Sequence, residues 1–358
     1  MSNTIKVSTP GRICLFGEHQ DYLGLPVIAA AISRRVNITG LNRNDGKAVI
    51  HLPDIQSQES FEIYPELEYL HKRDYFRSAL NILQREGYTF KKGLECTVEG
   101  NIPINSGTSS SSALLANWIH FLSRMADEPK PLSEKEIAEI AYRAEVVEFK
   151  EAGGMMDHYS TAVGNVIYLE STPKILVETL KPNFGSFVLG DSLEPKDTVG
   201  ILKRVKYGVL EAVEKIKKAY PDFSLFSVQE SDIKEFEALI SKDELDLIKA
   251  NIDNRDILIE ALALLKAENL NHQRFGELLA QHQLNLQALL KISTPKIDRM
   301  LAAAKEAGAY GGKINGSGGG GCMFVYAPEN TEEVAKSIER EGGKAYIIQI
   351  DKGTSLEN

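Results

Sequence analysis

The spacing of hydrophobic and polar residues changes several times along the first half of the chain. β-Branched residues and alternation predict strands over 5–16 and 26–42, and shorter strands over 47–52, 60–64 and 94–100. Apolar residues at helical spacing predict helices over 74–86, 113–126 and 137–152. Ser133 and Glu136 form a capping-box pattern before the third helix, and Gly153 and Gly154 end it. The first half is therefore predicted to mix strands and helices.

The second half is predicted to be mainly helical, with a few strands. Strands are expected over 164–170 and 186–192, and helical patterns then continue to about residue 307. The stretch KINGSGGGGCMFVYA supplies a glycine loop and a strand, and a helix over 332–342 precedes a strand over 344–351. We predict two domains, residues 1–178 and 179–358.

Composition and charge narrow the class of protein. With 358 residues and 43% hydrophobic content, the chain can bury the cores of one or two domains. The net charge of −9 argues against nucleic-acid binding, although a small anion needs only local donors. The three cysteines lack metal-ligand spacing, so reduced thiols are expected. Neither a signal peptide nor a membrane span is apparent. We expect a cytoplasmic monomer or homodimer that binds a small molecule and no membrane.

The run GTSSSSALLA lies directly before an apolar helix. The unpaired N–H groups at a helix N-terminus attract anions, and small residues let a phosphate approach the backbone. Serine also caps helices, so the run alone is equally compatible with an ordinary capped helix. It matches neither the Walker nor the Rossmann glycine pattern.

Three further segments carry candidate chemistry. The glycines of GGKINGSGGGGC favour a loop that closes on a ligand, with a plain turn as the alternative. The stretch PGRICLFGEHQDYLG gathers carboxylates and a histidine suited to a polyol, or forms a solvated hairpin loop. In EAGGMMDHY, Asp157 is placed to act as a general base, or is an ordinary cap residue.

Taken together and in this order, these four segments resemble the GHMP kinase superfamily, and most of all its galactokinase branch. PGRICLFGEHQDYLG is similar to that branch's N-terminal signature, NIPINSGTSSSSA to its phosphate loop, and KINGSGGGGC to its third motif. AEVVEFKEAGGMMDHY resembles the segment that carries its catalytic aspartate. The resemblance extends from about Pro10 to the end of the chain.

The resemblance implies an α+β fold, with an N-terminal domain of ribosomal-protein-S5 type and a ferredoxin-like C-terminal domain. The active site would lie between them and transfer the γ-phosphoryl group of ATP, with Mg²⁺, to the C1 hydroxyl of galactose or a similar sugar. L-Arabinose, galacturonate or a heptose phosphate are alternative acceptors. A catalytically silent sugar sensor on the same fold, or a decarboxylase of the mevalonate branch, are weaker alternatives.

The resemblance also implies roles for individual residues. Asp157 would be the base, with Arg12 stabilising charge beside it. Substrate contacts would come from Glu18, His19, Asp21 and Tyr207. Residues of two loops would surround ATP, namely Ser106, Gly107, Thr108, Ser109, Ser110, Ser111, Gly316, Gly318 and Gly319. The metal ligands would be Ser111, or its neighbour Ser110, and Glu145.

Two features of the sequence conflict with this assignment or depart from the family pattern. Helical periodicity from Ile137 favours Glu148 over Glu145 as the inward carboxylate, although the resemblance favours Glu145. Seven positions within the motifs depart from the family residues, two of which, Leu and Phe, are large and apolar, and these departures leave the sugar open. They are Gln20, Leu23, Leu25, Asn105, Thr108, His158 and Gly320.

Overall fold

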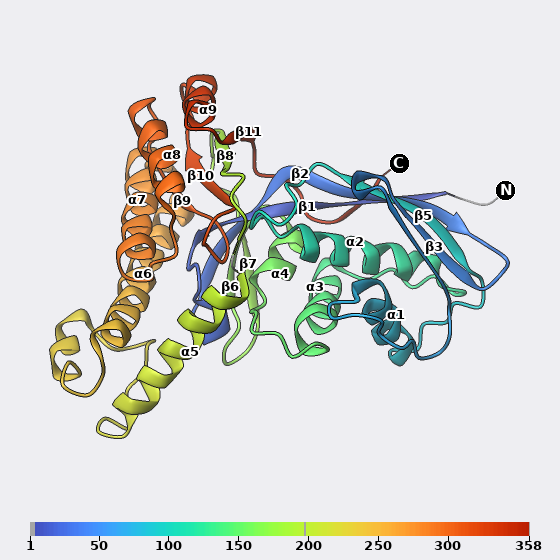
Figure 1. The fold of residues 1–358 in the computed structure, drawn as a ribbon, viewed down its shortest axis with the longest axis horizontal. Helices are drawn as coiled ribbons and strands as arrows, with labels where there is room; N and C mark the ends of the chain where they lie inside the picture. Colours follow the sequence, from blue (N-terminus) through green and yellow to red (C-terminus); the bar gives the residue numbers. More distant parts are fainter. Residues whose placement is uncertain (1–3, 197, 358) are drawn as a thin grey trace.

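The computed structural model describes residues 4–196 and 198–357 and contains two β-sheets with helices packed on them (Figure 1). Its strands are β1 (Ile5–Phe16), β2 (Val27–Asn42), β3 (Lys47–Leu52), β4 (Ser57–Glu62), β5 (Leu94–Gly100), β6 (Val166–Glu170), β7 (Leu176–Leu180), β8 (Phe187–Asp191), β9 (Gly311–Ile314), β10 (Cys322–Tyr326), β11 (Lys344–Ile348) and β12 (Ser355–Glu357). Its α-helices are α1 (Tyr75–Arg85), α2 (Ser110–Met125), α3 (Glu134–Tyr142), α4 (Met156–Val163), α5 (Thr198–Lys217), α6 (Lys242–Lys266), α7 (His272–Ala288), α8 (Pro295–Glu306) and α9 (Thr331–Arg340).

The first sheet has the strand order β12-β1-β2-β5-β3-β4, with β6 paired to β2 and β7 paired to β6. The long strand β2 pairs with β5 over residues 36–42 and with β6 over residues 27–30. Helices α1 to α4 cover one face of this sheet (Figure 1). Trp118, Phe121 and Leu122 of α2 are fully buried in the core between them, so burial of the apolar face of α2 holds this layer together.

The second sheet is antiparallel, with the order β11-β8-β10-β9. Helices α6 to α9 form the helical layer beside it (Figure 1). Its core joins Leu286 of α7, Ile297 and Met300 of α8 and Val334 of α9. The two sheets with their helices confirm the predicted mixed α+β class. Both β7 and the C-terminal strand β12 belong to the first sheet, and the domain division at residue 178 stays a prediction.

Several predicted boundaries were wrong by a few residues. The helix expected from residue 113 begins at Ser110, because a polar first turn carries no apolar periodicity. The strand expected over 60–64 lies at Ser57–Glu62. The helix expected over 137–152 is regular only to Tyr142 and continues as a π-helical turn (Arg143–Val147). The predicted capping box at Ser133 and Glu136 is confirmed.

Two expectations from the sequence concern the cysteines and membrane-spanning helices. Cys14, Cys96 and Cys322 are free and buried, as predicted. In the part of the chain that the structure describes, no helix combines the length and apolar character that crossing a bilayer requires.

Candidate active site

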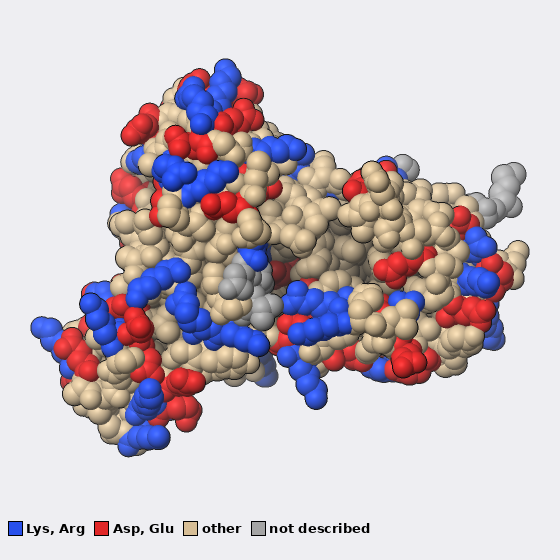
Figure 2. All heavy atoms as spheres, viewed as in Figure 1, with Lys and Arg blue, Asp and Glu red and all other residues tan. Residues whose placement is uncertain are grey.

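A cavity of about 770 Å³ lies between the two halves of the molecule. Figure 2 shows this face hollowed between them. The lining comes from the loop after β1, the loop before α2, the start of α4, the loop after β8 and the glycine loop (residues 315–321). The four segments singled out in the sequence therefore meet at one place.

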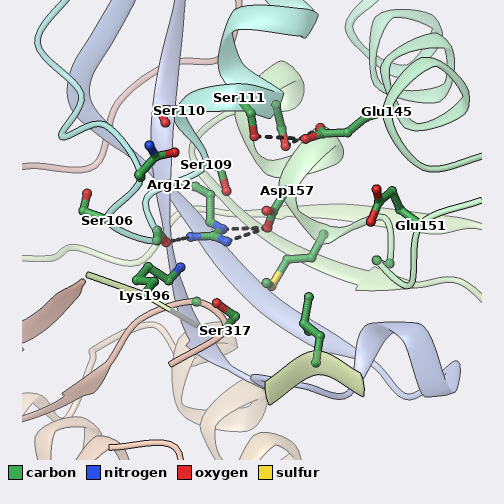
Figure 3. A pocket seen from close by; sticks show the side chains of 18 of the residues that line it. Arg12, Ser106, Ser109, Ser110, Ser111, Glu145, Glu151, Asp157, Lys196 and Ser317 are labelled. Atoms are coloured by element: carbon green, nitrogen blue, oxygen red, sulfur yellow. Dashed lines mark hydrogen bonds and ion pairs between the residues drawn. The ribbon is translucent and has the colours of Figure 1, made fainter. Parts of the chain in front are cut away.

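The buried Arg12 and the partly exposed Asp157, whose side chain is 33% exposed, form an ion pair at the centre of this lining (Figure 3). Nε and Nη2 of Arg12 donate to Oδ1 of Asp157 at 2.8 and 2.6 Å, and Nη1 donates to the carbonyl oxygen of Gly107. Burial alone would raise the pKa of Asp157, but the charge and hydrogen bonding of Arg12 hold it below its usual value. Asp157 is therefore ionised near neutral pH, and neither of these bonds uses its Oδ2.

Residues 105–111, called the phosphate loop after the family motif that they resemble, run into the N-terminus of α2. Ser109 is the N-cap residue, but it has a φ of 58° and its side chain does not cap the helix. Its Oγ is buried and lies beside Asp157, where it contributes to the lowered pKa of that carboxylate (Figure 3). The alternative of an ordinary capped helix therefore loses its support, since the end of α2 faces the cavity uncapped.

Glu145 points toward this helix end (Figure 3). Its carboxylate accepts hydrogen bonds from Ser111 Oγ at 2.9 Å, from Ser112 Oγ at 2.7 Å and from His158 Nε2 at 2.8 Å. Burial opposes ionisation, but the bond and charge of His158 and the bond from Ser112 lower the pKa of Glu145. An ionised carboxylate therefore lies beside the serines of the phosphate loop.

The choice between Glu145 and Glu148 follows from the π-helical turn. A regular helix would place Glu148 on the apolar face, but the wider π-helical turn at 143–147 shifts the register. Glu148 instead accepts from Tyr69 and Arg85, outside the cavity lining. The structure thus contradicts the choice from periodicity and brings Glu145 to the cavity.

The donor set near α2 fits a divalent cation with few protein ligands. Ser111 Oγ and Glu145 Oε1 lie 2.9 Å apart and both residues line the cavity. No cluster of three or more His, Cys, Asp or Glu suited to a metal occurs within residues 4–196 and 198–357. Mg²⁺ commonly uses one or two carboxylates, with phosphate and water oxygens completing its octahedron, so these residues fit that ion.

Glu18 is held by a residue from the other half of the chain. Its Oε2 accepts from Nζ of Lys313 on β9 at 2.8 Å, and the same ammonium donates to the carbonyl oxygen of Cys14 at 2.8 Å. Both side chains are almost fully buried. This pair fixes Glu18 at the edge of the cavity, because either partner alone would be a buried unpaired charge.

His19 and Asp21 complete the carboxylate and imidazole cluster. Nε2 of His19 faces the carbonyl oxygen of Ser317 at 3.1 Å, so Nε2 carries the proton and Nδ1 accepts from the Tyr22 hydroxyl at 2.7 Å. Burial lowers the pKa of His19 to about 4, which leaves the ring neutral. Burial and then the charge of Asp157 raise the pKa of Asp21 to about 6.

Gly154 is required for the position of Asp21. A Cβ atom at residue 154 would lie 2.0 Å from Oδ2 of Asp21. That oxygen accepts from the N–H of Met156 at 3.2 Å, and Oδ1 accepts from the N–H of Tyr22 at 2.9 Å. The prediction that Gly153 and Gly154 end a helix was wrong, because the π-helical turn ends at Val147, and Gly154 instead makes room for this carboxylate.

Some residues chosen from the sequence are not brought to the cavity. Tyr207 lies on α5, is 49% exposed and is not among the described residues that line the cavity; Val205 and Val209 take the inward face of the helix. Gly318 and Gly319 pack against Ile292 and not against the phosphate loop. Thr108 is buried below the loop and contacts Pro103 and Arg12. The residues that do line it are Arg12, Glu18, His19, Asp21, Ser106, Gly107, Ser109, Ser110, Ser111, Glu145, Asp157 and Gly316.

Other lining or supporting residues were missed from the sequence. Lys313 stands in the glycine-loop motif and Lys196 in the stretch GDSLEPKDT, but a single lysine in a loop carries no periodic signal. Arg73 and Glu151 form an ion pair on the far side of the cavity at 3.0 Å. Only the pairing of distant segments reveals these four.

The departures at Leu23 and Leu25 have a packing role. Both leucines pack in the core of the second half, and the side chain of Gln20 donates to the carbonyl oxygen of Asn251 at 2.9 Å. The loop after β1 therefore joins the two halves through the residues that differ from the family pattern.

Three family models match successive segments of the chain. They are the galactokinase galactose-binding signature (residues 2–40), the GHMP kinases N terminal domain (residues 74–165) and GHMP kinases C terminal (residues 258–347). This chain is a GHMP kinase. Its two-part architecture is thereby identified as the GHMP kinase fold, as the resemblance implied.

The relatives of this GHMP kinase include proteins named mevalonate kinase and proteins named galactokinase. It is 29% identical to the mevalonate kinase of Thermococcus onnurineus over 99% of this chain and 98% of that protein. It is 27% identical to the galactokinase of Pasteurella multocida, over 99% and 95% of the two chains. The galactokinase of Lactococcus lactis, solved with galactose, matches the fold with a TM-score of 0.86 and 22% identity, over 99% of this chain and 95% of that chain.

Proposed function

We propose that this GHMP kinase transfers the γ-phosphoryl group of ATP to a monosaccharide, first of all to the C1 hydroxyl of galactose or a galactose-like sugar. The observation that carries the proposal is the Arg12–Asp157 pair, which lies between an uncapped helix end and the cluster of Glu18, His19 and Asp21. An anion site and a polyol site thus face one ionised carboxylate. This is the arrangement that phosphoryl transfer to a hydroxyl requires.

In the proposed reaction the acceptor hydroxyl donates its hydrogen bond to Oδ2 of Asp157. A bond forms between the acceptor oxygen and the γ-phosphorus as the bond from that phosphorus to the bridging oxygen breaks, the proton passes to Asp157, and ADP leaves. Arg12 stabilises the charge that develops on the transferred group. Because the transition state is loose, the acceptor hydroxyl loses its proton late in the reaction. A carboxylate with a lowered pKa is therefore a strong enough base to accept it.

Mg²⁺ would be held by Glu145 and by Ser111, next to the helix end that receives the phosphates. When bound, it neutralises charge on the phosphate oxygens. His158 and Ser112 hold the second oxygen of Glu145, so they fix the carboxylate in this orientation.

The acceptor side supports a polyol because it offers several oxygen acceptors close together. Oxygens of Glu18 and Asp21 that are only partly used by protein donors can accept sugar hydroxyls. His19 would reach the sugar by exchanging its bond to the Ser317 carbonyl. The match to the galactose-binding signature over residues 2–40 covers this segment.

Mevalonate is a second candidate acceptor. It is favoured by the relatives named mevalonate kinase, of which the Thermococcus onnurineus protein is 29% identical. The two candidates differ in chemistry, because mevalonate carries a carboxylate and galactose carries none. L-Arabinose, galacturonate and heptose phosphates remain alternative sugars.

A screen of acceptors for ADP release tests the proposal. The purified chain is given MgATP with galactose, L-arabinose, galacturonate, glucuronate, N-acetylgalactosamine, a heptose phosphate or mevalonate. We expect turnover with a neutral sugar, and phosphorus NMR of the product would identify the hydroxyl that is phosphorylated.

Asp157→Asn provides the blank, and Asp222→Asn, which changes an exposed aspartate outside the cavity lining, provides the matched control. Turnover with mevalonate alone would show that the second candidate is the acceptor. Release of ADP with none of the acceptors would contradict the kinase proposal.

A further inference from the structure

Lys196 lies in the loop after β8 and extends into the cavity between the glycine loop and the phosphate loop (Figure 3). The Cδ atom of its stem is 2.7 Å from the place that a Cβ on Gly321 would take. Its Nζ is 3.1 Å from the place that a Cβ on Gly107 would take. Side chains at either glycine would displace the lysine, so the two loops form a passage that its side chain follows.

The ammonium group of Lys196 has no protein partner in the described ranges 4–196 and 198–357. Neither a hydrogen bond nor an ion pair of its Nζ occurs there, whereas the buried Lys313 is paired with Glu18. Burial and then the charge of Arg12 lower the pKa of Lys196. The charges of Asp157 and Glu18 offset part of this effect, but neither carboxylate bonds to the ammonium in the described part of the chain. The donors of a partly buried cation are therefore left for an anionic ligand.

The position of Lys196 distinguishes between the two anions that could reach it. Its Nζ adjoins Gly107, whose carbonyl oxygen already accepts from Arg12, and Arg12 in turn is bonded to Asp157. The ammonium therefore lies on the phosphate-loop side of the Arg12–Asp157 pair. Glu18, His19 and Asp21 are bonded to Lys313, Ser317 and Met156, and none of these three described residues bonds to Lys196.

We propose that Lys196 binds the γ-phosphoryl group of the nucleotide and stays bound to it during transfer. The inference rests on the proposed kinase function and adds a second cation to it. Arg12 commits three nitrogens to protein acceptors, whereas the ammonium of Lys196 can give its donors to the phosphoryl oxygens. Three negative oxygens that move between donor and acceptor would thus be held by Lys196 on one side and by Arg12 on the other.

The test compares binding of a non-hydrolysable ATP analogue with binding of ADP, both with Mg²⁺, by calorimetry. In Lys196→Met we expect the affinity for the ATP analogue to fall about tenfold, since a charge-assisted hydrogen bond is lost. The affinity for ADP, which lacks the γ-phosphoryl group, should change by less than about twofold. Lys196→Arg should restore part of the difference. Lys203→Met, an exposed lysine of α5 outside the lining, is the matched control.

Three results would overturn the inference. Equal losses for the ATP analogue and ADP would place Lys196 at another phosphate or in a structural role. Unchanged binding of both nucleotides, with a raised KM for an anionic acceptor, would assign Lys196 to the acceptor instead. If the unmodified protein binds neither nucleotide, the proposed function itself fails, and this result is distinct from the other two.

Discussion

The nucleotide side and the acceptor side of the cavity are constructed from different parts of the chain. On the nucleotide side, Ser111 and Glu145 are 34 residues apart in sequence, and Arg12 and Asp157 are 145 apart. On the acceptor side, Glu18 is paired with a lysine 295 residues away, and His19 faces a carbonyl group 298 residues away. The first side takes its carboxylates, Arg12 and the phosphate loop from one half of the molecule, and Lys196 and the glycine loop reach it from the other half. The second side depends throughout on bonds between the two halves.

This difference indicates where the phosphoryl-transfer chemistry and the choice of acceptor can be separated. Glu145 is bonded to serines at the start of α2, and Asp157 lies on α4. The phosphate loop is also bonded to Asn315 and Cys322 of the second half. The acceptor cluster depends on β9, the glycine loop and the core that receives Leu25. Changes in the second half that spare Lys196, Asn315 and Cys322 are therefore expected to alter the acceptor side while Glu145 and Asp157 keep their places.

The largest effect is expected from Arg12→Gln. It removes the cation from Asp157, so burial dominates and the pKa of Asp157 rises above its usual value. We expect kcat/KM to fall about a thousandfold near neutral pH and the acid limb of the pH–rate profile to move to higher pH. Arg85→Gln, which changes a half-exposed ion pair, is the control. An unmoved acid limb would show that Arg12 does not set the pKa of Asp157.

A comparison of Glu145→Gln with Glu148→Gln sharpens the account of the nucleotide side. Replacing Glu145 should raise the Mg²⁺ concentration for half-maximal activity by about ten- to a hundredfold. Replacing Glu148, which contacts Tyr69 and Arg85, should leave that concentration unchanged. The measurement is a Mg²⁺ titration at saturating ATP and acceptor. The reverse pattern would show that Glu148 serves the metal, in agreement with the choice made from helical periodicity.

The acceptor side should respond to pH through Asp21. Its pKa is raised to about 6, so the carboxylate is ionised above that pH and protonated below it. A protonated Asp21 loses acceptor capacity, so KM for the acceptor should rise about tenfold for each unit below pH 6. Acceptor KM measured between about pH 5 and about pH 8 would check this. In Asp21→Asn the dependence in this range should disappear, and its persistence would assign it to another group.

The smallest predicted effects are those on acceptor KM of changes at Tyr22 and Tyr207. Tyr22→Phe removes the hydroxyl that donates to Nδ1 of His19, which should cost about 1 kcal/mol, or about a fivefold rise in acceptor KM. Tyr207→Phe alters an exposed hydroxyl on α5 and should change acceptor KM by less than about twofold. Steady-state kinetics of the two variants test the contrast. A larger effect at Tyr207 would show that α5 contacts the acceptor in the working enzyme.

Much of the fold and the nucleotide side was predictable because local patterns encode them. Periodicity predicted α1 and most of α2, and the capping residues predicted the start of α3. The resemblance of four ordered segments led to Arg12, Asp157 and Glu145, which the structure brings to one cavity. Glu148 was wrongly favoured by periodicity because the π-helical turn changes the residue spacing that a helical wheel assumes.

The sequence by itself determined the kinase family, the mixed α+β class and the helix that follows the serine run, since these depend on local spacing and on motif order. Tertiary structure alone decided that Lys313 holds Glu18, that Lys196 enters the cavity and that Tyr207 stays outside it. The physical reason is that a charge finds its partner by distance in space, and no local pattern records which of two segments 295 residues apart will supply it.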